Sequence, residues 1–171
     1  DLPKTLPNIV ERKVEDIPGL QAFKARHKDA KNSMAVGIDL VKNGQADAFV
    51  TAGNTGAASV TAYFRLGTIA GVDRPALAPV FPTATGSCVV TDVGANPDCK
   101  PENLLQFAIM GSIYAEHILN IVNPRVGLMS IGEEDSKGSK STKEAFQILE
   151  KTRLNFIGNV ESHDMFEGAV D

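Results

Sequence analysis

The segment 53–56 reads Gly-Asn-Thr-Gly and lies between a short apolar run and an alanine-rich stretch. This order predicts a buried strand over 46–50, a tight turn, and a helix that continues through 57–66. Asn54 or Thr55 would cap that helix. The first N–H groups of a helix lie at the positive end of its dipole and lack intrahelical acceptors, so they attract an anion. The segment therefore predicts an oxyanion site, and a plain connection without a ligand is the alternative that the same pattern allows.

Other polar residues follow three more predicted strands, over 87–93, 125–131 and 155–157. Ligands of open α/β sheets bind beyond the carboxyl ends of the strands, so these loops are candidates for the same site. The side chains suited to chemistry there are Asp92 and Asn96, then Lys137, which is placed to meet an anion, and then Asn159. The alternative for Asp92 and Asn96 is that they only brace their loop.

Helices are predicted between these strands, which gives the chain a repeated order of strand, polar loop and helix. Apolar spacing predicts helices over 32–43 and 101–121, and a further helix that begins at Ser141 or Thr142. A strand over 76–80 and a turn over 82–86 precede the strand at 87–93. The fold class that follows is α/β with a mostly parallel sheet.

Composition narrows the class of protein. The 171 residues are 43% hydrophobic and carry a formal net charge of −4. This negative charge gives no indication of a basic face that would bind nucleic acid. The two cysteines provide neither a disulfide framework nor a metal-ligand spacing. A basic stretch over 20–31 is either a solvated helix face or a docking patch for an acidic partner. The sequence begins with Asp1 and would fit a portion of a larger protein.

Several motifs of covalent and nucleotide chemistry are absent from the sequence: GxGxxG, the Walker lysine motif, GxSxG and a Cys–His signature. The remaining amides, hydroxyls, backbone N–H groups and cations bind an oxyanion and stabilise developing negative charge. No cofactor and no metal ion are expected.

Seven segments resemble, in order, those of the PlsX family, the acyl-carrier-protein-dependent phosphate acyltransferases of bacterial phospholipid synthesis. They are DAFVTAGNTGA at 47–57, DRPALAP at 73–79, DVGAN at 92–96, KPENLLQ at 100–106, NPRVGL at 123–128, TKEA at 142–145 and NFIGNVE at 155–161. The family's glycine-containing first strand and its C-terminal part have no counterpart here. The resemblance runs from about Met34 to the end, and we expect residues 1–171 to form a single α/β domain that is an incomplete portion of the family's chain.

The resemblance implies that inorganic phosphate and a long-chain acyl-acyl carrier protein give an acyl phosphate and free carrier. It also implies a three-layer αβα fold like that of isopropylmalate and isocitrate dehydrogenases. A cytoplasmic homodimer, peripheral on the membrane, is the expected state.

The mechanism expected from the resemblance makes phosphate itself the nucleophile. The expected catalytic residues are Asn54, Asp92, Lys137 and Asn159, and the expected binding residues are Gly53, Asn54, Thr55, Gly56, Asn96, Glu134 and Gly138. Asn159 would face the acyl group or the carrier's pantetheine arm. Two alternatives stand beside this function: a phosphotransacetylase-like acyl-CoA:phosphate acyltransferase, and a non-catalytic module that binds a carrier protein.

Overall fold

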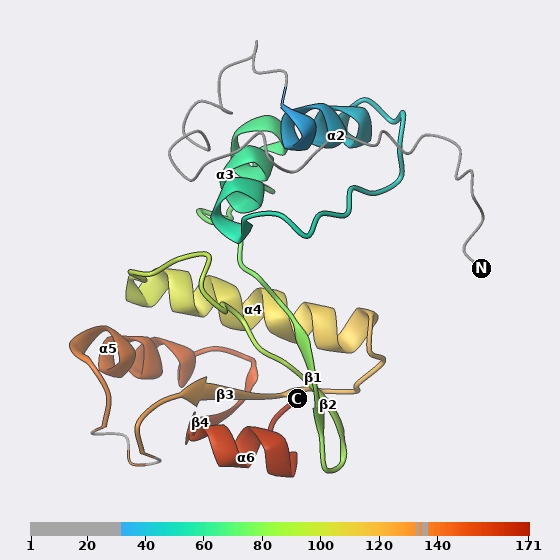
Figure 1. Cartoon of the computed structure of the whole chain (residues 1–171). Coiled ribbons are helices and arrows are strands. Elements are labelled where there is room, and N and C mark those ends of the chain that lie inside the picture. The colour runs from blue at the N-terminus through green and yellow to red at the C-terminus, as the bar shows by residue number, and fades with distance from the viewer. Residues whose placement is uncertain (1–31, 133, 135–136) are drawn as a thin grey trace. The chain divides into compact units, whose positions relative to one another are not determined.

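The computed structural model describes residues 32–132, 134 and 137–171. The chain divides into two compact units, Asp1–Pro75 and Ala76–Asp171 (Figure 1). The basic stretch over 20–31 lies outside the described residues. Among the helices of the described residues, none combines the length and the apolar composition that crossing a membrane requires.

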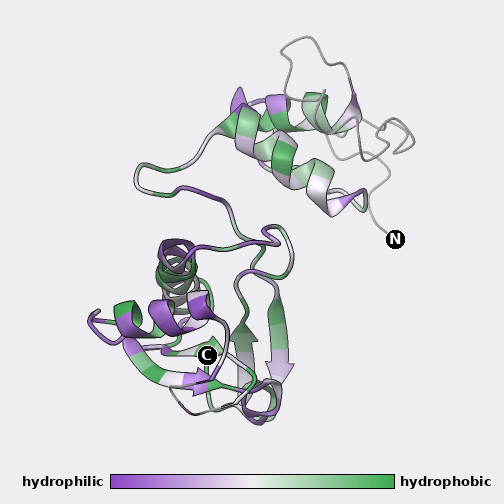
Figure 2. Cartoon of the chain, turned by 90° about the vertical axis from the view of Figure 1, so that its left-hand side faces the viewer, coloured by the Kyte–Doolittle hydropathy of each residue, from purple (hydrophilic) through white to green (hydrophobic). Residues whose placement is uncertain are grey.

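The described part of the first unit contains two helices, α2 (Ser33–Lys42) and α3 (Thr55–Leu66). Each is capped by an asparagine: Asn32 Oδ1 accepts a hydrogen bond from Ala35 N at 2.8 Å, and Asn54 Oδ1 accepts one from Ala57 N at 3.0 Å. Of the two predicted caps for α3, Asn54 is therefore the one that the structure shows. The helices pack through an apolar cluster made of Met34, Ala57, Phe49 and Ala58. Figure 2 shows both helices as a mixture of apolar and polar residues, which is typical of helices with one buried side.

The strand predicted over 46–50 is absent, so that prediction is wrong. The segment has no regular secondary structure, and the Val50 side chain is 92% exposed. A strand needs a neighbour for its backbone N–H and C=O groups, and the described residues of this unit offer only helices. Phe49 packs instead against Gly37, where the ring leaves no room for a Cβ. The apolar run therefore anchors a loop to α2.

The second unit begins with an antiparallel hairpin of β1 (Val80–Thr83) and β2 (Gly86–Val89). The turn falls within the predicted 82–86, but the first strand starts at Val80, where the predicted strand over 76–80 ends. The second strand ends at Val89, so Asp92 follows it in a loop instead of ending the strand.

A parallel pair of strands forms the rest of the sheet structure in the described residues. It joins β3 (Arg125–Met129) to β4 (Asn155–Val160), with Leu128 opposite Asn159 and an irregularity between Val126 and Gly127. The helix α5 (Lys140–Leu149) connects the two strands, α4 (Pro101–His117) precedes them, and α6 (Ser162–Glu167) follows them. A mixed α/β fold with a parallel pair is thus confirmed.

The C-terminal segment links the hairpin to the parallel pair. Asp171 N donates to Arg125 O at 3.0 Å, and Val89 N donates to Asp171 O at 2.8 Å. The neighbouring Val170 is buried in a cluster with Cys88, Val160 and Met165. This backbone bridge and this cluster fix β2 beside the start of β3.

Candidate functional site

The segment 53–56 forms the exposed start of α3. Asn54 is its N-cap, and Thr51 Oγ1 accepts a hydrogen bond from Gly53 N at 3.0 Å. Thr55 and Gly56 are exposed in the first turn of the helix, where an α-helix supplies no acceptor for backbone N–H groups. The local geometry is therefore the one that attracts an anion to a helix N-terminus.

Asp92 forms the centre of a second cluster, in the loop after β2. Its Oδ1 accepts a hydrogen bond from Leu77 N at 2.7 Å, and its Oδ2 accepts from Asn96 N at 2.7 Å and from Asn96 Nδ2 at 3.2 Å. Desolvation raises the pKa of Asp92, but the hydrogen bonds from Leu77, Asn96 and Ala95 hold it below its usual value. Both carboxylate oxygens thus brace the loop.

Glu134, Lys137, Gly138 and Asn159 form a third cluster, in which Asn159 lies near the end of β4 and the other three lie in the segment after β3. Asn159 is 7% exposed, and its Nδ2 donates to the backbone oxygen of Glu134 at 2.9 Å. Lys137 Nζ lies 3.8 Å from Glu134 Oε1, and both side chains are exposed to solvent over about half of their surface or more. The structure therefore brings together four of the residues that the sequence predicted for the site.

The helix α5 starts next to this cluster, and its cap was missed in the sequence. Its N-cap is Ser139, two residues before the predicted start at Ser141, and Ser139 Oγ accepts a hydrogen bond from Thr142 N at 3.2 Å. The signal for it is a serine directly after Gly138, the glycine that ends the preceding loop. The hydroxyls of Ser139 and Thr142 lie 2.9 Å apart.

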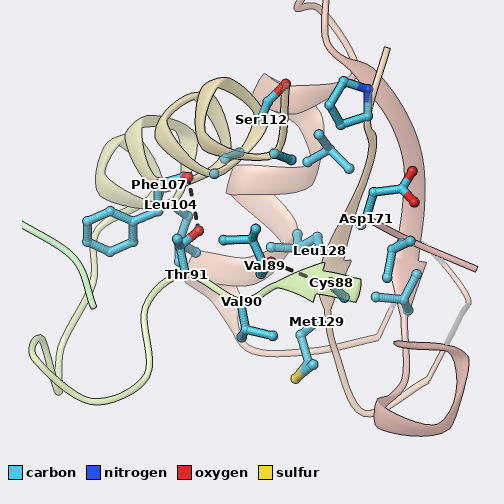
Figure 3. Close-up of a pocket in the computed structure, with 18 of the residues that line it drawn as sticks. Cys88, Val89, Val90, Thr91, Leu104, Phe107, Ser112, Leu128, Met129 and Asp171 are labelled. Atoms are coloured by element: carbon cyan, nitrogen blue, oxygen red, sulfur yellow. Dashed lines mark hydrogen bonds between the residues drawn. The ribbon is translucent and has the colours of Figure 1, made fainter. Parts of the chain in front are cut away.

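A cavity of about 250 Å³ lies within the second unit, between α4 and the strands β2 and β3 (Figure 3). Its wall is mainly apolar and includes Val89, Leu104, Phe107 and Leu128. Asp92 and Asn96 also line it. Thr91 Oγ1 donates to Phe107 O at 3.0 Å and so ties the loop after β2 to α4. The sequence did not predict this cavity, because residues far apart in the chain form its wall.

Cys88 and Asp171 line the same cavity. Burial raises the pKa of the Cys88 thiol, and the Asp171 carboxylate raises it further. The pKa of Asp171 is lowered by its hydrogen bonds and charge pairing with Arg125, which outweigh desolvation. The thiol is therefore neutral and the carboxylate ionised near neutral pH.

Metal binding has no candidate among the described residues, since they contain no group of three or more His, Cys, Asp and Glu side chains placed to hold an ion. The described residues do include groups of the kind that bind anions, namely the first turn of α3 and the exposed ammonium of Lys137.

The fold and these clusters define a mixed α/β protein with polar loops at strand and helix ends. The sequence matches the family described as "Fatty acid synthesis protein" over residues 18–171. The chain belongs to this family, and the resemblance to the PlsX family is thereby confirmed.

Individual relatives support the same assignment. The chain is 51% identical over 147 residues to a phosphate acyltransferase of Thermoanaerobacterium thermosaccharolyticum. The aligned region covers 86% of this chain and 44% of that protein. It is 48% identical over 173 residues to one of Halothermothrix orenii (96% and 52%), and 55% identical over 146 residues to one of Koribacter versatilis (82% and 41%). The chain thus spans about half the length of these curated relatives.

Proposed function

We propose that this chain carries part of a phosphate acyltransferase, which makes an acyl phosphate from inorganic phosphate and a long-chain acyl-acyl carrier protein. The observation that carries the proposal is the identity of about half of the aligned residues to relatives that bear the name phosphate acyltransferase. Membership of a fatty acid synthesis family supports the long acyl chain and the carrier protein as substrates.

The reaction needs a bound nucleophile more than it needs a nucleophilic side chain. A phosphate oxygen attacks the thioester carbonyl carbon, and the carbonyl oxygen takes the negative charge of a tetrahedral intermediate. The C–S bond then breaks, the carrier leaves as its thiolate, and the new C–O bond remains in the acyl phosphate. The protein contributes by holding phosphate in line with the carbonyl and by stabilising the oxyanion.

The proposed roles are those expected from the sequence, and the local geometry of each cluster supports them. The first turn of α3, with Asn54, Thr55 and Gly56, holds phosphate through backbone N–H groups, and Gly53 allows close approach. The Lys137 ammonium offsets negative charge at the reacting centre.

The remaining site residues hold the polar loops in shape. Asp92 and Asn96 keep the loop after β2 in shape. Glu134, Gly138 and Asn159 belong to the cluster around Lys137.

The finer features of the family resemblance belong to the same proposal. They are the three-layer αβα architecture, a single domain, a homodimer, and a cytoplasmic location at the periphery of the membrane.

Acyl phosphate formation by the full-length protein tests the proposal. We expect product from inorganic phosphate with palmitoyl-acyl carrier protein, and at least tenfold less with palmitoyl-CoA. Equal or faster turnover of the CoA thioester would instead favour a phosphotransacetylase-like enzyme. Capture of the carrier protein without any acyl phosphate would favour a non-catalytic binding module.

A further inference from the structure

The backbone carbonyl of Glu134 accepts hydrogen bonds from two groups that matter for the site. Asn159 Nδ2 donates to it at 2.9 Å, and the backbone N–H of Lys137 donates to it at 2.9 Å. A carbonyl oxygen has two lone pairs and can accept both bonds. A buried side chain of β4 is therefore linked to the backbone of Lys137 through a single atom.

The chain is also held in place on the other side of Lys137, at Gly138. Its φ of +92° lies in the region that favours glycine. A Cβ at this position would lie 3.0 Å from Ser130 Oγ and 3.0 Å from Thr142 Cβ. The backbone after Lys137 thus packs closely against the end of β3 and the first turn of α5.

The side chains of Ser130 and Asn159 lie on the same face of the strand pair. Leu128 is opposite Asn159 in the parallel register, and Ser130 lies two residues beyond Leu128. Asn159 Oδ1 and Ser130 Oγ are both inaccessible to solvent. Asn159 Nδ2 holds the Glu134 carbonyl and Ser130 Oγ lies close to Gly138, so both side chains contact the segment that carries Lys137.

Lys137 itself is exposed, in contrast to its supports. Its side chain is 47% exposed, and Nζ lies 3.8 Å from Oε1 of Glu134, whose side chain is 67% exposed. The ammonium group of a lysine is placed more precisely when the backbone of that lysine is fixed. The side chain then loses less conformational freedom when it binds an anion.

We propose that Asn159, together with Ser130, is a positioning residue that sets the place of Lys137, and that it does not contact the substrate. The proposal rests on the proposed function in one respect, which is that the anion met by Lys137 is inorganic phosphate. The shared Glu134 carbonyl carries the proposal, because removal of the Asn159 donor frees the oxygen atom that also holds the Lys137 backbone N–H.

A double-mutant cycle on the full-length protein tests this coupling, with inorganic phosphate as the titrant in calorimetry. We expect Lys137→Ala and Asn159→Ala each to weaken phosphate binding about tenfold, which corresponds to about 1.4 kcal/mol. If Asn159 acts through Lys137, the double variant binds no more weakly than Lys137→Ala alone. Independent contacts would multiply to about a hundredfold loss, and that result would overturn the proposal.

Asn155→Ala is the matched control. Asn155 lies on the same strand, and its Nδ2 also donates to a backbone carbonyl, that of Asn123 at 3.0 Å. We expect this variant to keep wild-type phosphate affinity, and an equal loss in both asparagine variants would assign the effect to general weakening of β4. If Asn159→Ala does not fold, Asn159→Asp keeps the shape and loses the donor, and the same comparison applies.

Acyl phosphate formation is measured on the same proteins. A wild-type protein that binds phosphate with the expected coupling but makes no acyl phosphate would refute the proposed function and leave the positioning role in place. If the wild-type protein makes acyl phosphate but the variants show no coupling between Lys137 and Asn159, the positioning role would be refuted and the proposed function would stand.

Discussion

Asp92 Oδ2 accepts two hydrogen bonds from the same residue, from the backbone N–H of Asn96 at 2.7 Å and from its Nδ2 at 3.2 Å. With Oδ1 bound to Leu77 N, the carboxylate closes the loop after β2 onto the segment before β1. A residue placed after a strand in an α/β protein invites a catalytic interpretation, yet its oxygens are already bonded to the backbone of its own unit.

Asp92→Asn therefore has a structural consequence. The amide places a donor against backbone N–H groups, and we expect the free energy of unfolding to fall by about 1–3 kcal/mol at pH 7. Chemical denaturation measures this loss. Asp47→Asn is the control, because Asp47 is exposed in the first unit, and a surface change of this kind is expected to stay within about 0.5 kcal/mol.

The pH dependence of stability provides a second measure of Asp92. Its folded pKa lies below the unperturbed 3.8, so its stabilising contribution is present above about pH 4 and is lost as the pH falls through the folded value. Wild-type stability should drop more steeply than that of Asp92→Asn as the pH is lowered from about 5 to about 3. If the free energies of unfolding of wild type and Asp92→Asn fall in parallel with pH, the Asp92 carboxylate does not stabilise the fold through its hydrogen bonds.

The pair of Arg125 and Asp171 gives another stability prediction. Arg125 Nε and one terminal nitrogen each donate to the Asp171 carboxylate at 2.8 Å, and Arg125 N donates to it at 2.9 Å. Arg125→Lys removes the two-point geometry, and we expect a loss of about 1 kcal/mol in unfolding free energy. The exposed pair of Lys140 and Glu144, 3.7 Å apart, is the comparison, and Lys140→Ala should change stability by less than about 0.5 kcal/mol. Equal losses in the two variants would show that the bidentate geometry adds nothing.

The caps of α2 and α3 were predictable from sequence, because capping is local. Asn32 and Asn54 each lie three residues before the N–H group that they bind. The strand predicted over 46–50 was wrong because strand formation is not local. A strand exists only where another strand pairs with it, and an apolar run does not specify its partner.

The candidate site shows the same division between local and distant contacts. The residue types at Asn54, Lys137 and Asn159 marked polar strand and helix ends. However, the bond from Asn159 to Glu134 joins positions 25 residues apart, and no local pattern predicts it. The cavity beside α4 was missed for the same reason, because Val89, Phe107 and Leu128 meet there only in the folded unit.

The two caps also offer a matched pair of variants. Asn32→Ala and Asn54→Ala each remove a side-chain acceptor from the first turn of a helix, and each should lower the free energy of unfolding by about 1 kcal/mol. Asn43→Ala, at the end of α2, changes a residue whose backbone makes the cap bonds and should cost less. Similar losses in all three would contradict the assignment of the caps.

The variants Asn32→Ala and Asn54→Ala also test the central claim, which is that the start of α3 binds the phosphate substrate of a phosphate acyltransferase. The measurement is the KM for inorganic phosphate and the kcat of acyl phosphate formation from palmitoyl-acyl carrier protein, in the full-length wild type, Asn32→Ala and Asn54→Ala. The account predicts that Asn54→Ala raises the phosphate KM at least tenfold, while Asn32→Ala, with the same loss of stability, leaves it at the wild-type value. An unchanged KM and kcat in Asn54→Ala, or an equal rise in both variants, would contradict it.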